Sequence, residues 1–157
     1  MPFSVSSYPQ GILRKGRRRE ITRSIKVSDH MVERPVTISG RSVVAEAAKV
    51  IVENKVSGLI VVDQENSVIG MLSELDCLRS LLAEVYNQGQ VGAAPVVSVM
   101  TTPVTTASLD GDIISVAESM LSQKQRRRPV VNNGKLEGQV TCRQLLTAIL
   151  EFGPDSN

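Results

Sequence analysis

A stretch of this chain occurs twice with the same order of residue types. Val68–Leu82 and Leu136–Leu150 each read as an apolar strand that bends at its end and continues into a helix. The matched positions are Gly70 with Gly138, Ser73 with Thr141, and Asp76 with Gln144. A single unit of this size cannot bury enough apolar surface to be stable alone. Two duplicated halves should therefore pack against each other.

Each copy contains the same succession of expected elements. In the first copy these are a helical turn over 27–31, a strand over 35–38, a helix over 43–55 capped by Ser42, strands over 58–62 and 68–72, and a helix over 73–86. In the second they are a turn over 96–100, a strand over 103–106, a helix after the cap Asp112, strands over 129–131 and 136–140, and a helix over 141–150. Asn133 and Gly134 predict a tight hairpin turn. The fold class is α/β, of the α+β kind, with tandem β-α-β-β-α units.

The charge of the chain is unevenly distributed. Residues 1–26 hold seven basic residues and one acidic residue, whereas the remainder holds 11 basic and 15 acidic residues, for a net charge of +2. We expect 1–26 to be a flexible basic arm. Repeat 1 then spans 27–86, a loop-like linker spans 87–95, repeat 2 spans 96–150 and a tail spans 151–157.

Composition excludes several classes of function. Aromatic residues make up 3% of the chain, which argues against a base-stacking surface for single-stranded nucleic acid. His30 is the only histidine and has no partners at metal-ligand spacing, so neither a metal site nor a catalytic triad is expected. No apolar run has transmembrane length. We expect a cytoplasmic protein that is not an enzyme, with Cys77 and Cys142 both reduced and buried.

The order of motifs in both copies resembles a known family. Met-x(2–3)-Pro-Val-Thr, helix, apolar strand and Gly-x-x-Ser/Thr-x-x-Asp/Gln together are similar to the CBS-domain pair, or Bateman module, over about residues 27–150. The resemblance implies two sheets packed as a pseudo-two-fold pair with two clefts between the repeats. It also implies that a cleft binds an adenosine-containing ligand, such as AMP, ADP, ATP or S-adenosylmethionine. Binding would regulate a partner protein, with no cofactor and no reaction of its own.

The resemblance also implies which residues line the clefts. Asp76 would accept hydrogen bonds from ribose hydroxyls, and Gln144 stands where the second such Asp is expected. Phosphate would meet the helix starts at Ser73 and Thr141. The remaining implied contacts are Thr37 and Thr105 near phosphate or ribose, Arg127 and Arg128 at phosphates, and Gly58, Leu59, Ile60, Pro129 and Val130 along the adenine.

Structural explanations compete with these assignments. Ser73-x-x-Asp76 and Thr141-x-x-Gln144 both fit helix capping boxes. The run Arg126–Arg128 could be a solvated charge cluster, and Thr37 and Thr105 could be ordinary strand residues.

Two hypotheses for the function follow. The first is a stand-alone sensor of an adenosine-containing ligand. The second is a ligand-free homodimeric scaffold whose basic arm docks on nucleic acid or on an acidic partner. The resemblance implies a homodimer formed by the second helix of each repeat. The side chains considered for this surface are Leu78, Leu81, Leu82, Leu145, Leu146 and Ile149.

Overall fold

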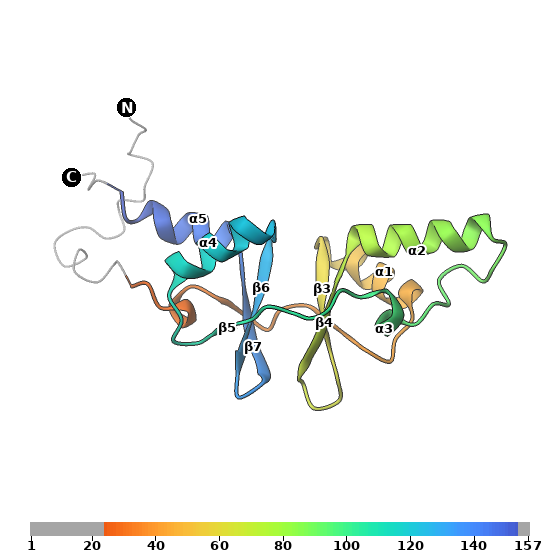
Figure 1. Ribbon diagram of the computed structural model, residues 1–157, viewed down its shortest axis with the longest axis horizontal. Helices are drawn as coiled ribbons and strands as arrows, with labels where there is room; N and C mark the ends of the chain where they lie inside the picture. Colours follow the sequence, from red (N-terminus) through yellow and green to blue (C-terminus); the bar gives the residue numbers. More distant parts are fainter. Residues whose placement is uncertain (1–23, 154–157) are drawn as a thin grey trace.

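The computed structural model describes residues 24–153, which form two similar α+β halves side by side (Figure 1). The first half contains β2 (Thr37–Ser39), α1 (Val44–Asn54), β3 (Gly58–Val62), β4 (Val68–Ser73) and α2 (Glu74–Tyr86). The second contains β5 (Ala107–Ser108), α4 (Ile113–Gln123), β6 (Arg127–Asn132), β7 (Lys135–Thr141) and α5 (Cys142–Leu150). The predicted fold class and the duplicated order of elements are therefore confirmed.

Each half is built on a small mixed sheet. The first sheet has the order β2-β3-β4, with β2 parallel to β3 and β4 antiparallel to it. The second has the order β1-β7-β6-β5, and its extra strand β1 (Val32–Glu33) runs antiparallel to β7. The four longer helices, α1, α2, α4 and α5, lie along one edge of the molecule, and the two hairpins extend away from them (Figure 1).

The leading segment of each repeat is the stretch that precedes β2 or β5, residues 27–36 and 96–106. The start of each leading segment packs into the core of the other repeat. The 3-10 helix η4 (Val27–Asp29) places Val27 among Ile113, Met120 and Val130 of the second half. In return, the short helix α3 (Val96–Val99) places Val96 in the core of the first half. The backbone repeats this exchange. The Val27 amide donates to the Gly111 carbonyl at 2.8 Å, and the Val96 amide donates to the Ser42 carbonyl at 2.9 Å.

The hairpin tips form a second junction between the halves. Asn133 and Gly134 have φ values of 54° and 80°, so the predicted tight turn is confirmed. The Leu136 amide donates to the Asn66 carbonyl at 3.0 Å, and the Asn66 side-chain amide donates to the Leu136 carbonyl at 3.1 Å. The two repeats are thus linked at their strand tips as well as through the exchanged segments.

The N-terminus of α1 differs from the expectation that Ser42 caps it. The N-cap is Val43, which has no polar side chain, and the linker supplies the missing acceptors. The Val44 amide donates to the Ala94 carbonyl at 2.8 Å and the Ala45 amide to the Gly92 carbonyl at 3.0 Å. In α4 the Asp112 cap is confirmed, because its carboxylate accepts from the Ile114 amide at 2.7 Å.

Three further expectations need correction. The strand expected over 103–106 begins later, at Ala107, where pairing with β6 starts. Cys142 is exposed at the start of α5, whereas Cys77 is buried as expected. Of the side chains considered for a dimer surface, Leu145 is only 5% exposed in the second core, and Leu81 packs against the first core.

The boundary of the basic arm also falls earlier than expected. Residues 24–26 belong to the folded second half, because the Ile25 carbonyl accepts from the Ile113 amide at 2.8 Å and Lys26 pairs with Asp112. The rest of the predicted arm, 1–23, lies outside the described residues, as does 154–157 at the other end.

Candidate functional site

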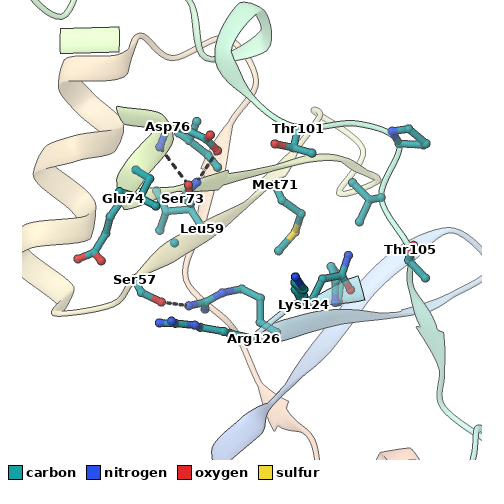
Figure 2. Close-up of a pocket in the computed structure, with 18 residues that line it drawn as sticks. Ser57, Leu59, Met71, Ser73, Glu74, Asp76, Thr101, Thr105, Lys124 and Arg126 are labelled. Atoms are coloured by element: carbon teal, nitrogen blue, oxygen red, sulfur yellow. Dashed lines mark hydrogen bonds between the residues drawn. The ribbon is translucent and has the colours of Figure 1, made fainter. Parts of the chain in front are cut away.

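A cavity of about 500 Å³ lies between the two halves (Figure 2). Volumes of this order hold small organic ligands and cofactors. The first half contributes the start of β3, the end of β4 and the first turn of α2, and the second half contributes a leading segment and the junction between α4 and β6. The lining residues are Ser57, Gly58, Leu59, Met71, Leu72, Ser73, Glu74, Leu75, Asp76, Thr101, Pro103, Val104, Thr105, Lys124, Gln125, Arg126, Arg127 and Pro129.

Ser73 and Asp76 form one wall of this cavity, at the point where β4 becomes α2. The Asp76 amide donates to Ser73 Oγ at 3.0 Å, and the Ser73 amide donates to Asp76 Oδ2 at 3.0 Å. The pair is thus a complete capping box, and it also faces the cavity. Arg79 lies 3.5 Å from Asp76 Oδ1, which leaves carboxylate lone pairs free to accept hydrogen bonds from a ligand.

The opposite wall is cationic and comes from repeat 2. Lys124 ends α4 in the left-handed conformation, and Arg126 and Arg127 lead from it into β6. The Arg127 guanidinium crosses to the first half, where Nη2 donates to Ser57 Oγ (Figure 2). Burial lowers the pKa of Arg127 from its ordinary value, and the negative charge of Glu74 acts in the opposite direction. This guanidinium is therefore partly desolvated.

Apolar side chains complete the cavity between these two polar walls. Met71 and Thr101 are paired through both backbone bonds, at 3.1 and 2.8 Å, so the leading segment of repeat 2 runs directly over β4. This pairing carries Pro103 and Val104 into the lining, opposite Leu59. An apolar slot flanked by polar ends suits a flat aromatic base that carries a polar substituent.

The structure brings together only part of the predicted site. Seven of the predicted residues line the cavity: Gly58, Leu59, Ser73, Asp76, Thr105, Arg127 and Pro129. The other six are absent from its lining: Thr37, Ile60, Arg128, Val130, Thr141 and Gln144. Ile60 and Val130 are buried core residues of the two sheets. Whether any of these residues binds a ligand stays a prediction.

Arg128 needs a correction, because its side chain turns away from the cavity. It is 3% exposed, and its guanidinium donates to Ser119 Oγ at 3.0 Å and to Gln125 Oε1 at 2.6 Å. Successive side chains of a strand point to opposite faces, so Arg127 and Arg128 cannot face the same cleft wall. The structure therefore places the Arg128 side chain outside this cavity, in contact with Ser119 and Gln125.

Thr37 and Thr105 were expected to occupy equivalent positions, but the strand pairing shows that they differ by one residue. Ile38 pairs with Val61 in the first sheet, and Ala107 pairs with Val130 at the matching place in the second. Thr37 therefore corresponds to Thr106, whereas Thr105 lies before the strand and lines the cavity. The shift follows from the unequal spacing between Met and Pro in the two leading segments.

Thr141 and Gln144 form the matching capping box in repeat 2. Gln144 Oε1 accepts from the Thr141 amide at 2.8 Å, which confirms the structural explanation for this pair. The two boxes share the bond from the N-cap amide, but the Thr141 hydroxyl donates to Gln144 Oε1, whereas Ser73 Oγ accepts from the Asp76 amide. Only the first box lines the cavity.

Sequence reasoning missed much of the lining. The missed residues are Ser57, Met71, Leu72, Glu74, Leu75, Thr101, Pro103, Val104, Lys124, Gln125 and Arg126. Most lie next to predicted positions, and the run Arg126–Arg128 was a visible signal for the cations. The contribution of 101–104 depends on the exchanged leading segment, which the sequence pattern did not reveal.

The described part of the chain has neither a metal-type cluster nor a membrane-spanning helix. Across residues 24–153 no group of three His, Cys, Asp or Glu side chains could hold a metal ion. None of the helices there has the length and apolar character needed to cross a membrane.

Two duplicated α+β halves with a ligand-sized cavity between them define a tandem-repeat binding module. The family model for the CBS domain matches residues 27–83 and again 88–151. The chain therefore belongs to the CBS-domain family, as its motifs suggested.

Comparisons with known proteins agree with this assignment. The structure of CBSX2 in complex with AMP has a TM-score of 0.72 and 28% identity, and covers 82% of this chain and 98% of that one. The CBS domain pair of protein MJ0100, in complex with 5'-methylthioadenosine and S-adenosyl-L-methionine, has a TM-score of 0.69 at 23% identity over 82% of this chain and 98% of that one, which shows the shared fold.

A CBS pair is also found inside a longer enzyme. Inosine-5'-monophosphate dehydrogenase of Aquifex aeolicus is 29% identical over 134 residues, or 84% of this chain. The match spans 26% of that enzyme's length, so the enzyme's activity does not transfer to this chain.

Proposed function

We propose that the cavity between the repeats binds an adenosine-containing ligand and that its occupancy regulates a partner protein. One observation carries the proposal. The carboxylate of Asp76 and the helix start at Ser73 face Lys124, Arg126 and Arg127 across an apolar slot of ligand size. Asp76 would accept hydrogen bonds from the ribose hydroxyls, and the cations would meet the phosphates. The complex of the similar CBSX2 structure with AMP supports the same ligand class.

Thermal unfolding with a panel of ligands tests this proposal. The panel is AMP, ADP, ATP, S-adenosylmethionine and NAD, with GTP as a control for the base. A ligand at 100 times its Kd adds about 2.7 kcal/mol to the free energy of unfolding, which raises the Tm of a chain this size by roughly 5–10 °C. We expect such a shift with at least one adenine compound and a smaller one with GTP. No shift at millimolar concentrations of any adenine compound would contradict the proposal.

We also propose that the regulatory output passes through a homodimer. Leu78 and Leu82 on α2 and Leu146 on α5 are exposed, and both helices lie along the same edge of the molecule (Figure 1). Exposed apolar patches of this kind mark interaction surfaces. A second copy could cover both helices at once.

Light scattering at micromolar concentration tests the dimer. We expect twice the chain mass of 17.0 kDa. Leu82→Lys combined with Leu146→Lys should lower the mass toward that of one chain. Leu121→Lys is the matched control, because Leu121 is exposed on α4, outside the proposed surface. A monomeric mass for the unmodified protein would refute the dimer.

The alternative function depends on residues 1–23, which lie outside the described part of the chain. A scaffold whose basic arm docks on nucleic acid or an acidic partner stays a prediction, as does the cytoplasmic location. Deleting 1–23 separates the two functions, because the sensor should still bind its ligand and the scaffold should lose its partner.

A further inference from the structure

The charged side chains that line the cavity are unequally distributed between its two walls. Repeat 1 contributes the acids Glu74 and Asp76, and repeat 2 contributes Lys124, Arg126 and Arg127 without any acid. Asp76 already accepts from the Ser73 amide, and the cap geometry fixes it close to the start of α2. The cationic wall therefore faces the cavity with an excess of positive charge.

The cations of this wall have no carboxylate within ion-pair distance in the described part of the free protein, although the negative charge of Glu74 acts on Arg127. Among residues 24–153 the ion pairs within 4.0 Å are Arg79 with Asp76 and Lys135 with Glu65, and neither involves the cationic wall. Arg127 is held by the neutral hydroxyl of Ser57, and Lys124 and Arg126 are exposed to solvent. A partly desolvated guanidinium whose partner is neutral gains a direct charge–charge attraction from an incoming anion, and its paired N–H groups suit phosphate oxygens.

The two arginines of the cationic wall are a feature of repeat 2 alone, whereas Lys124 has a counterpart in Lys55, which ends α1 in the same left-handed conformation. Gly58 pairs with Ser73, and Arg127 pairs with Thr141 at the matching register, so Arg127 occupies the place that a glycine has in repeat 1. Arg126 likewise corresponds to Ser57. Duplication of the fold does not require these arginines, and they are not needed to pair an acid within the protein. These arginines line the cavity on the side of Ser57, where the negative charge of Glu74 offsets part of their positive charge, and Asp76 lies on the other side (Figure 2).

We infer that the ligand of this cavity is an adenine nucleotide with two or three phosphates, whose phosphate chain runs from Asp76 toward Lys124 and Arg126. This inference rests on the proposed function and narrows its ligand class. A nucleoside triphosphate offers three phosphate groups to the three cations, whereas a monophosphate offers only one. A sulfonium ligand such as S-adenosylmethionine would place a positive charge near the same cations.

Isothermal titration with ATP, ADP, AMP, 5'-methylthioadenosine and S-adenosylmethionine tests the inference, in buffer with EDTA at two salt concentrations. Exposed ion pairs are individually weak, so two additional pairs predict a Kd for ATP on the order of tenfold lower than that for AMP. Salt should reduce this ratio, because it screens exposed charges. The two ligands without phosphate should bind more weakly than AMP.

Two single variants test whether the cationic wall causes the preference for ATP over AMP. Lys124→Gln and Arg126→Gln change exposed side chains, and each should reduce the ratio of the AMP and ATP dissociation constants about threefold. Lys49→Gln is the matched control, because Lys49 is exposed on α1 and does not line the cavity. An unchanged ratio in both wall variants would overturn the inference.

The remaining outcomes separate this inference from the proposed function. If S-adenosylmethionine or 5'-methylthioadenosine binds as tightly as ATP, the phosphate inference is wrong and the adenosine site stands. If AMP, ADP and ATP bind equally at both salt concentrations, the inference is also wrong. If none of the five compounds binds, both the inference and the proposed function fail.

Discussion

Replacing Val96 by Asp is expected to remove roughly 3–5 kcal/mol of the free energy of unfolding, the typical cost of an uncompensated buried charge. Val96 belongs to repeat 2 in sequence but is 0% exposed in the core of the first half, beside Val44 and Leu72. Domains of this kind are stable by only about 5–15 kcal/mol, so this single change approaches complete unfolding. Urea denaturation followed by far-UV circular dichroism measures the loss.

The neighbouring residue provides the control for this substitution. Val97 is 49% exposed on the same short helix, so Val97→Asp should cost less than about 0.5 kcal/mol. If Val96→Asp fails to fold, Val96→Ala still tests the packing, with an expected loss of about 2 kcal/mol from the lost apolar contacts. Equal stability of the variants at positions 96 and 97 would show that α3 does not pack into the first core.

Replacing Asp76 by Ala is expected to abolish most of the stabilisation by an adenine ligand. Hydrogen bonds to a charged group contribute about 1.5–3 kcal/mol, so the Kd should rise on the order of 10- to 100-fold. The variant also loses one half of a capping box, which lowers the stability of the free protein by about 1 kcal/mol. Titration calorimetry separates the two effects, because it reports binding rather than stability.

Gln144→Ala is the matched control for Asp76→Ala. Gln144 makes the same type of bond to the amide of its N-cap residue, at 2.8 Å against 3.0 Å for Asp76, but it does not line the cavity. Both variants should therefore lose a similar amount of stability, and only Asp76→Ala should lose affinity. Unchanged affinity in both variants would remove Asp76 from the site even if the ligand class is right.

The architecture of each half was predictable because its signals are local. The apolar run Gly58–Val62 and the turn at Asn133 and Gly134 fix strands and a hairpin within a few residues. The spacing of apolar residues fixes α1 and α4 in the same way. The repeated Gly-x-x-Ser/Thr motif then shows that the two halves are equivalent.

The parts that sequence reasoning missed are set by contacts between distant segments. Nothing local indicates that Val27 completes the second core, or that the linker carbonyls of Gly92 and Ala94 cap α1. Thr105 lines the cavity because it lies one residue earlier relative to β5 than Thr37 does relative to β2. The Arg128 side chain turns away because successive side chains of β6 point to opposite faces. Half of the cavity wall depends on such non-local placements.

The exchange of leading segments between the halves affects how the chain folds during its synthesis. While the ribosome is still making residues 27–86, the first half lacks Val96, and Val27 has no partner surface to cover it. The first half cannot complete its core until α3 has emerged, so its folding during synthesis must wait for the start of repeat 2. Fragments cut between the repeats would each lack a piece of their own interior, and gene fusions should therefore transfer the pair as a unit.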